Sequence, residues 1–360
     1  MMAEDRPQDG YASGAASRRR VLAAAAMVPL LAGAAPAAAR TLPAGENGPA
    51  EPTGAAEPAH SDEPAHAAGA ADPAGTAGHL IRPAATSESD WADVADALGR
   101  GGNMLRESTY HTGFPRRDLH VVSDGVVVTP GLSLGTHVAF VRYADGSTML
   151  MGDVVVTEDE LQQVSDAWHE HGIEQTALHK HLLSQYPAIW WTHVHAHGHD
   201  AAAMARGLRA GLDRTATPPP KPPPPEVPLD LDTAGIEAAL GVRGSTEESV
   251  FKCLFVRRET IADGHLVLPP GLGSTSAFIF QPTGGGRAAL NGDCAMTAQE
   301  VQHVLKALRS GGIELVELHH HHLTESPRLF FVHFWAVGDA VELARTLRRA
   351  VDATDVVPLG

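Results

Sequence analysis

The chain is 360 residues long, enough for two domains of ordinary size, and carries a formal net charge of −16. This charge argues against general nucleic-acid binding, which needs a basic surface, and against adhesion to an anionic surface by charge alone. The chain has two cysteines, Cys253 and Cys294. They could form a disulfide in an exported protein, and two buried free thiols are the alternative.

The N terminus has the three-part pattern of a signal peptide. Arginines at positions 18–20 precede an alanine-rich apolar run over 21–35, and alanines at 37–39 offer a cleavage site. Adjacent arginines before a leucine resemble the twin-arginine type. We predict a signal peptide over 1–39 and no stable transmembrane segment after processing; an uncleaved anchor is the alternative. Because no cysteine lies near the cleavage point, we expect an extracytoplasmic protein, secreted or associated with the cell envelope, that is not a lipoprotein.

The next segment, residues 40–87, is rich in alanine, proline, glycine and acidic residues and has almost no large apolar side chains. Such a composition cannot bury enough surface to offset the entropy of ordering, so we predict that it is disordered. It contains His60, His66 and His79, which could bind metal loosely but which we expect to be solvated.

The rest of the chain contains an internal repeat. Residues 152–198 align with residues 292–338 without a gap, and both copies keep a Gly-Asp pair, a Gly-Ile-Glu sequence and three histidines. We therefore predict two homologous repeat domains, over 88–215 and 230–354. A proline-rich linker over 216–229 joins them and should be semi-rigid.

The same order of elements is predicted in each repeat from hydrophobic periodicity, turn residues and a capping box at Thr157. In the first repeat we expect a helix over 91–98, strands over 104–110, 126–129, 137–143 and 148–156, a helix from 157 to about 172, strands over 174–183 and 188–197, and a helix over 200–214. In the second we expect a helix over 236–240, strands over 250–256, 265–268, 276–281 and 288–296, a helix over 297–309, strands over 314–323 and 329–337, and a helix over 339–353. Segregated strands and helices, with strands paired as hairpins, indicate an α+β fold with antiparallel sheets.

The last strand pair of each repeat carries the histidines. In the first copy these are His179 and His181 on one strand and His193, His195 and His197 on the next, all at intervals of two, so that each set shares a face. If the loop is 184–188, His179 lies opposite His193 and all five rings face one way. A loop one residue shorter would turn His193 to the other face. The same register would pair His319 with His333 and place His321 beside them.

Three imidazoles on adjacent strands suit zinc, copper, nickel or iron with a vacant coordination position. We therefore expect a metal site of this kind in each half of the molecule. Four acidic residues are candidates for a further ligand, for orienting an imidazole or for a general base: Glu174, Glu314, Asp153 and Asp293.

Simpler interpretations stand beside this one. Histidines in half-buried strands often only hydrogen-bond to the backbone or to a carboxylate. The two Gly-Asp pairs are equally consistent with turn formation. The arginine pairs 116–117 and 257–258 could hold an anion, although a solvated strand edge is the preferred interpretation. His320 and His322 match Lys180 and Leu182 of the first copy, and we expect them to face away from the site.

The stretch 312–322, Gly-Ile-Glu-Leu-Val-Glu-Leu-His-His-His-His, and the stretch 326–335, Ser-Pro-Arg-Leu-Phe-Phe-Val-His-Phe-Trp, resemble the signature of the LppY/LpqO family of exported bacterial proteins, as does the sequence Thr-His-Val-His-Ala-His-Gly over 192–198. The resemblance covers about residues 90–354. It implies a tandem domain outside the cytoplasm and supplies no activity and no catalytic residues.

Two functions follow as hypotheses. The first is an exported protein that binds a transition metal through the hairpin histidines and is possibly a metal-dependent hydrolase. The second is a non-catalytic module that binds a small-molecule or cell-envelope ligand, with structural histidines. Whether the protein is an enzyme stays open at this point.

Overall fold

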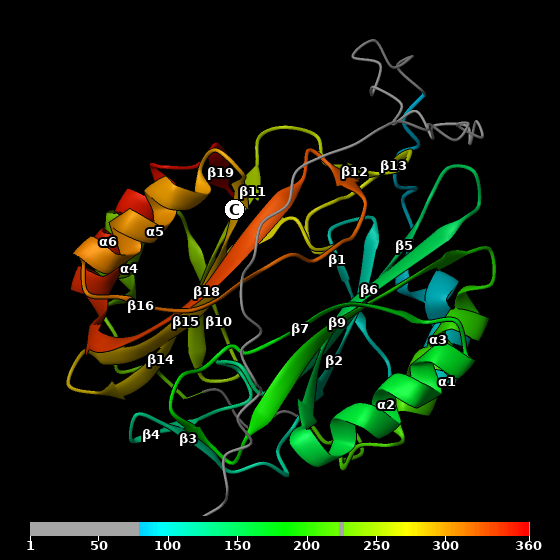
Figure 1. Ribbon diagram of the computed structural model, residues 1–360, viewed down its shortest axis with the longest axis horizontal. Helices are drawn as coiled ribbons and strands as arrows, with labels where there is room; N and C mark the ends of the chain where they lie inside the picture. The colour runs from blue at the N-terminus through cyan, green and yellow to red at the C-terminus, as the bar shows by residue number, and fades with distance from the viewer. Residues whose placement is uncertain (1–78, 223–226, 360) are drawn as a thin grey trace, which may run out of the picture. The chain divides into compact units, whose positions relative to one another are not determined.

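The computed structural model describes residues 79–222 and 227–359. The predicted signal peptide, most of the segment 40–87 and two of its histidines, His60 and His66, lie outside the described residues; His79 is exposed. The described chain contains two copies of one α+β unit, each with an antiparallel sheet and three α-helices (Figure 1).

The first copy consists of the 3₁₀ helix η1 (Glu88–Trp91), α1 (Ala92–Leu98), β1 (Asn103–Leu105), β2 (Thr109–Pro115), β3 (Val121–Ser123), β4 (Val126–Val128), β5 (Gly135–Arg142), β6 (Thr148–Thr157), α2 (Glu158–Glu170), β7 (Glu174–His179), β8 (Gln185–Tyr186), β9 (Ile189–Gly198) and α3 (Ala201–Leu212).

The second copy consists of α4 (Thr233–Leu240), β10 (Gly244–Glu247), β11 (Val250–Arg257), β12 (Ala262–Asp263), β13 (Leu266–Val267), β14 (Thr275–Gly284), β15 (Arg287–Thr297), α5 (Val301–Ser310), β16 (Glu314–His319), β17 (Glu325–Ser326), β18 (Leu329–Asp339), α6 (Ala340–Val351) and β19 (Val356–Pro358).

The two main sheets have matching strand orders. The first runs β1-β2-β5-β6-β9-β7 and the second β10-β11-β14-β15-β18-β16, with β19 added on β11. Neighbouring strands in both sheets are antiparallel. Two small sheets, β4-β3-β8 and β13-β12-β17, hold the segments that follow β7 and β16. The predicted α+β fold with two homologous repeats is confirmed.

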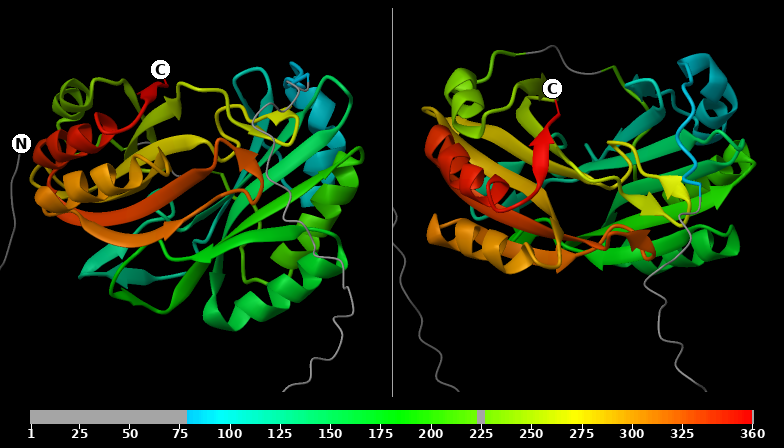
Figure 2. Two further views of the ribbon diagram at one scale, coloured as in Figure 1. Left: turned by 45° about the horizontal axis from the view of Figure 1, so that its top comes forward. Right: turned by 90° about the horizontal axis from the view of Figure 1, so that it is seen from above.

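Helices cover only one face of each main sheet. Helices α1–α3 pack on the first sheet through a core that includes Trp91, Val164 and Leu208, and α4–α6 pack on the second in the same way. Figures 1 and 2 show the two helical layers on opposite sides, with both sheets between them. The other faces of the sheets pack against each other, because two further apolar clusters combine side chains of both repeats, for example Met151 with Phe331.

Helix α2 shows how the local sequence sets these elements. Thr157 accepts a hydrogen bond from the Glu160 amide while the Glu160 carboxylate accepts one from the Thr157 amide, so that two free amides at the helix start are satisfied. Leu161, Val164 and Trp168 are spaced along one face and are buried against the sheet. The predicted capping box and helix are confirmed.

Several boundaries differ from prediction. The strand expected over 104–110 is two strands, β1 and β2, separated by a turn in which Arg106 has a φ of 59°. The last part of the segment predicted to be disordered, residues 79–87, lies within the described chain and makes ordered contacts. Ile81 forms a β-bridge with Leu266 of the second repeat, and Pro83 forms one with Tyr143 of the first. Backbone pairing with Leu266 and Tyr143 therefore orders a segment that its composition alone predicts to be disordered.

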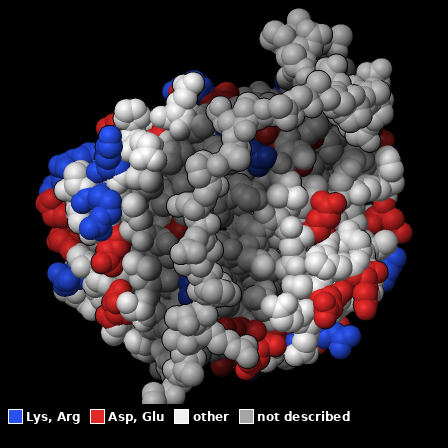
Figure 3. Space-filling view, viewed as in Figure 1, with Lys and Arg blue, Asp and Glu red and all other residues white. Residues whose placement is uncertain are grey.

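The prediction that the two arginine pairs are solvated is wrong for two of the four side chains, Arg116 and Arg257. Arg116 is completely buried and forms ion pairs with Asp118 and Glu160, at 2.8 and 2.9 Å. Arg257 repeats this arrangement in the second copy with Glu259 and Glu300. In each copy the buried ion pairs connect the end of a strand, β2 or β11, to the start of a helix, α2 or α5. Exposed charges of both signs are mixed over α5 and α6 on the face shown in Figure 3.

The two cysteines are buried free thiols on β11 and β15, with β14 between those strands. Burial raises the pKa of the Cys253 thiol to about 12. Among the described residues, no helix is long and apolar enough to cross a membrane.

Candidate metal centre

The histidines of both repeats come from the same two positions of the fold. In the first copy His193 lies in the middle of β9, next to β6, while His179 ends β7 and His181 lies in the loop beyond it. The second copy places His333, His319 and His321 in the same way. Each sheet thus presents three imidazoles on the face that its helices leave free.

The predicted hairpin register is wrong by two residues. His179 lies opposite Trp191, and His193 lies opposite Ala177 and, on its other side, Asp153. Side chains alternate with a period of two, so a shift of two leaves His179 and His193 on their predicted face. Beyond a bulge between Gln175 and Ala177 the shift is three residues. The strand also ends at His179 rather than at residue 183. The loop that follows allows His181 to turn back toward His179, whose Nε2 lies 2.9 Å from Nε2 of His181.

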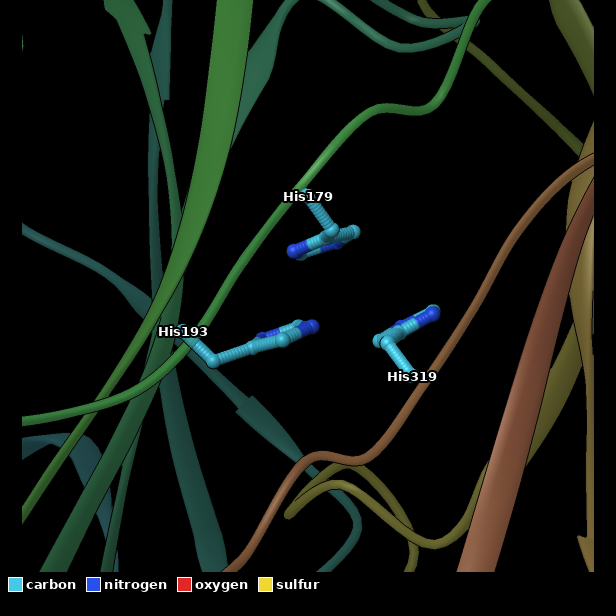
Figure 4. A group of neighbouring side chains, drawn as sticks. All are labelled: His179, His193 and His319. Atoms are coloured by element: carbon cyan, nitrogen blue, oxygen red, sulfur yellow. The ribbon is translucent and has the colours of Figure 1, made fainter. Parts of the chain in front are cut away.

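The two sets meet in one cluster instead of forming a separate site in each repeat. The ring centroids of His179 and His319 are 4.2 Å apart, those of His181 and His333 are 3.8 Å apart, and those of His193 and His321 are 4.3 Å apart. Every one of these pairs joins the first repeat to the second. Figure 4 shows His179 and His193 facing His319 across a common space. We call these six residues the histidine centre; all six are at most 8% exposed.

Hydrogen bonds between the repeats fix the loops that carry these rings. The Thr176 hydroxyl donates to the His321 carbonyl at 2.6 Å, and the Asn291 amide donates to the His181 carbonyl at the same distance. The Lys180 amide donates to Glu317 at 2.8 Å. The centre is therefore built by both repeats and is incomplete in either one alone.

Backbone carbonyls orient the rings. Nδ1 of His333 lies 3.0 Å from the Gly292 carbonyl, Nδ1 of His321 lies 3.1 Å from the Gly273 carbonyl, and Nδ1 of His193 is 3.4 Å from that of Gly152. A protonated Nδ1 that donates to a carbonyl leaves a lone pair on Nε2, as in the second shell of metal sites. The Gly-Asp pair that occurs in both repeats thus supports the site through its glycine carbonyl in each copy.

One of these glycines leaves no space for a side chain without a movement of the backbone. Gly292 adopts a φ of 154°, and a Cβ atom there would lie 2.0 Å from the carbonyl oxygen of Ala277 on the neighbouring strand. A side chain at this position would push β15 away from β14 and move the carbonyl that holds His333.

The nitrogens that face the interior of the centre are left without partners. In the histidine centre, the buried nitrogens that make no hydrogen bond to a described residue are Nδ1 of His179, Nε2 of His193, both ring nitrogens of His319, Nε2 of His321 and Nε2 of His333. A buried polar atom without a partner is costly, so a group of them calls for a compensating interaction. Two overlapping sets have ligand atoms within 4.8 Å of one another: His179, His193 and His319, and His179, His181 and His333.

Two carboxylates border the centre. Asp153 lies 3.2 Å from Nε2 of His181, and Asp293 lies 3.5 Å from Nε2 of His321. Burial raises the pKa of Asp153 to about 8, an effect that the neighbouring Asp293 increases and that His321 partly offsets. Burial also acts on Asp293, but its close contact and charge interaction with His321 outweigh it and lower the pKa of this carboxyl. The two copies of one aspartate therefore have different protonation behaviour.

Five of the imidazoles, those of His179, His181, His193, His319 and His333, have a lowered pKa and are neutral at ordinary pH. Burial, reinforced by the neighbouring histidines, lowers the pKa of His179, His193 and His319 well below its usual value. Burial lowers the pKa of His181 to about 3. Neutral imidazole is the form that binds a metal ion.

A cavity between the repeats includes Asp153, which borders this centre, in its wall. It has a volume of about 490 Å³, is mainly apolar, and is lined from the first repeat by Met151 and Asp153 and from the second by Leu254 and Ala277. His137 also lines it and stacks on His111, with the two rings 5.2 Å apart. Sequence reasoning missed this pair, since the equivalent of His137 in the second copy is Ala277.

The other predicted site residues lie outside the histidine centre. Glu174 and Glu314 are exposed, and the Glu174 carboxylate is 3.8 Å from Nδ1 of His195. His197 is exposed. His195 is half-buried and belongs to a different group with Asp263 and His322, whose ligand atoms are within 4.8 Å of one another. His322 was expected to face away; it is buried in this second group. Sequence gave no signal for Asp263, which enters from the small sheet β13-β12-β17.

One protein-family model matches the chain twice, over residues 92–214 and 234–353. The chain belongs to this family, described as Domain of Unknown Function (DUF1259). Both DUF1259 copies contain their three histidines of the centre. The family carries no assigned activity, and none of the curated proteins matches the chain.

Several solved structures of microcompartment shell proteins show a weak likeness. A double-ringed trimeric shell protein of the RMM microcompartment is 16% identical over 57% of this chain and 82% of its own, with a TM-score of 0.17. The trimeric shell protein PduB is 14% identical over 72% and 95%, with a TM-score of 0.18. EutL from Clostridium perfringens is 11% identical over 70% and 93%, with a TM-score of 0.15. Similarity at this level carries no argument about the DUF1259 pair.

Proposed function

We propose that this tandem DUF1259 protein binds one divalent transition-metal ion in the histidine centre between its repeats. The observation that carries the proposal is that imidazole nitrogens without hydrogen-bond partners converge from both copies. In three of these rings the other nitrogen, Nδ1, lies close to a backbone carbonyl, that of Gly152, Gly273 or Gly292. A core that only stabilised the fold would gain nothing from five buried rings with unpaired nitrogens, since apolar side chains of similar volume would avoid the cost.

The donor set fits such an ion. Ligand atoms bound to one zinc ion at about 2.1 Å lie about 3.0–3.5 Å apart, so donors within 4.8 Å of each other need only small side-chain movements. Both three-histidine sets include His179, so they are alternatives for one ion. An all-nitrogen set of this kind suits zinc, copper, nickel or iron.

Metal-dependent hydrolysis is the finer form of this proposal. The apolar cavity of about 490 Å³ supplies space for a substrate, and Asp153 borders both the cavity and His181. A bound ion would supply Lewis acidity. With its pKa raised to about 8, Asp153 is suited to hold and release a proton near neutral pH beside the substrate space. We assign this carboxyl the role of general base or acid.

The biological setting is proposed from sequence. The resemblance to exported LppY/LpqO proteins and the twin-arginine pattern over 18–22 support export, without a lipid anchor, to the cell envelope or beyond. A twin-arginine signal fits a protein that folds around its metal before export. In this setting the cavity would receive a small-molecule or cell-envelope ligand.

Metal analysis of the purified, untagged protein tests the proposal. We expect His193→Ala combined with His333→Ala to lose the ion of the centre, because the pair removes one unpaired Nε2 from each of the two alternative three-histidine sets. His303→Ala is the matched control, since His303 is exposed on α5. Unchanged metal content in the double variant, with the fold intact by circular dichroism, would favour the non-catalytic ligand-binding module with structural histidines.

A further inference from the structure

A second cluster of ligating side chains joins the repeats at a different place. His195 lies on β9 of the first repeat, and Asp263 on β12 and His322 after β16 belong to the second. Nε2 of His195 is 3.5 Å from Oδ2 of Asp263, and Nδ1 of His322 is 3.7 Å from the same oxygen. None of the three belongs to the histidine centre.

The two rings are prepared to bind an ion rather than to pair with each other. Nε2 of His322 lies 3.1 Å from the Leu272 carbonyl, which directs the lone pair of Nδ1 toward Asp263. Nδ1 of His322 and Nε2 of His195 are buried and make no hydrogen bond to any described residue. His322 is only 1% exposed, so its free nitrogen is also shielded from water.

The internal repeat provides a comparison within the molecule. The positions that correspond to His195, Asp263 and His322 in the opposite copy are occupied by Trp335, Ser123 and Leu182. There, Trp335 and Leu182 pack in an apolar cluster, and the Ser123 hydroxyl donates to the Leu183 carbonyl. The fold is therefore stable with an apolar set at this location. Three polar residues with metal-ligating groups occur together on one side only, which points to a binding role.

This cluster also opens to solvent on one side. A pocket of about 460 Å³ is lined by His195 and Asp263, with His197 and Asp145 at its wall. Three ligands from the protein and one face toward a pocket are typical of metal sites that keep a position for water or a substrate.

We propose that His195, Asp263 and His322 form a second divalent transition-metal site, of the two-histidine, one-carboxylate type with open coordination positions toward the pocket. It suits Fe²⁺ or Zn²⁺. The ligand class that this site takes is a small oxygen-donor molecule that enters the pocket and completes the coordination. The site goes beyond the metal proposed for the histidine centre and depends on none of its residues.

The test is a titration of the metal-free full chain with Co²⁺, followed by visible absorption and calorimetry. We expect the wild type to bind about two ions per chain, one at each site. Asp263→Ser combined with His322→Leu introduces the residues that the first repeat already has at these positions. This variant should lose one ion, with an affinity at least about a hundredfold lower at this site, and keep the other. His265→Gln is the matched control, because His265 is exposed and lines the same pocket outside the cluster.

Each outcome decides the proposal. It is overturned if the double variant still binds Co²⁺ as the wild type does, or if the wild type binds one ion that His193→Ala combined with His333→Ala removes. If the wild type binds one ion that only the Asp263→Ser and His322→Leu variant removes, this site stands and the proposal for the centre fails. Should the double variant not fold, His195→Gln, which keeps a polar side chain of similar size, replaces it and should also lose one ion.

Discussion

At the scale of single residues, each copy contains a buried arginine that forms structural ion pairs. From the sequence, this arginine was expected to be exposed or to bind an anion. We predict that Arg116→Ala lowers the free energy of unfolding by about 3 kcal/mol, because it leaves Asp118 and Glu160 without their buried partner. Urea unfolding measures the effect. Arg117→Ala is the neighbouring control, and its half-exposed pair with Glu248 should contribute less than about 1 kcal/mol. Equal effects would contradict the assignment.

Gly292 links backbone geometry to the histidine centre. We predict that Gly292→Ala destabilises the metal-free protein by about 1–3 kcal/mol and weakens metal binding, because the new methyl group would collide with the Ala277 carbonyl and displace the carbonyl that orients His333. Gly101→Ala is the control, since a Cβ there meets no atom within 4 Å. If both variants unfold at the same urea concentration, the close approach of Gly292 to the Ala277 carbonyl does not contribute to the free energy of unfolding.

The sequence could identify some site residues and not others, for a physical reason. His179, His193 and their counterparts occur twice at equal spacing, and this pattern was visible. His322 stands where the first copy has Leu182, and Asp263 stands where it has Ser123, so repetition concealed them. Their partnership with His195 depends on how the two repeats pack, which periodicity within one strand does not encode.

At the scale of elements, a helix start is well predicted where a side chain caps it, because caps are local: α2 begins one residue after the expected 157, whereas α5, expected from 297, begins at Val301. The two equivalent helices differ here. Thr157 caps α2 with its hydroxyl, whereas α5 begins after Glu300 with no side-chain cap. We predict that Thr157→Ala costs about 1 kcal/mol of unfolding free energy and that Thr297→Ala costs only a few tenths. Thermal and urea unfolding check this difference; an equal loss in both variants would disprove the capping role.

The strand pairs illustrate what local sequence leaves undetermined. The positions of β7 and β9 and the face of their histidines were predictable from alternation. The register was not, because the strand ends at His179 and the pairing beside the loop is shifted by two residues, while a bulge between Gln175 and Ala177 adds one more for Glu174 and Gln175. Only the parity of the register decides which face a side chain occupies, so the prediction of a shared face survived this error.

At the scale of the whole molecule, the main difference from prediction is that the two histidine sets, expected to be separate, form one cluster. Each sheet has one face covered by helices and one face left open, and burial of the open faces brings the two copies together. The sequence repeat predicted both sets of histidines. It could not show that they meet, because the arrangement of the repeats follows from side chains dispersed along the whole chain.

The buried histidines make the stability of the metal-free protein depend on pH. Their pKa values are lowered in the folded state, so the unfolded chain takes up protons first as the pH falls below about 6.5. Stability should therefore be fully present above pH 6.5 and decrease below it, by on the order of 1.4 kcal/mol per pH unit for each net proton. Asp153, with its pKa raised to about 8, opposes this trend between pH 3.8 and 8 but is a single group.

Urea unfolding of the metal-free protein at pH 8, 7, 6 and 5 would measure this dependence. The matched variant is His179→Phe, which removes one buried titrating ring and should flatten the curve below pH 6.5. A wild-type stability that is constant, or that rises, from pH 6.5 to 5 would contradict the burial of neutral imidazoles.

The most direct measurement of the central claim is an anomalous difference map from crystals of the untagged protein loaded with Zn²⁺. The account predicts a peak within bonding distance of His179 and of histidines from both repeats, His193 and His319 or His181 and His333. If zinc is found only at exposed histidines, with the rings of the centre ordered and no peak among them, the claim that two repeats build one metal centre is wrong.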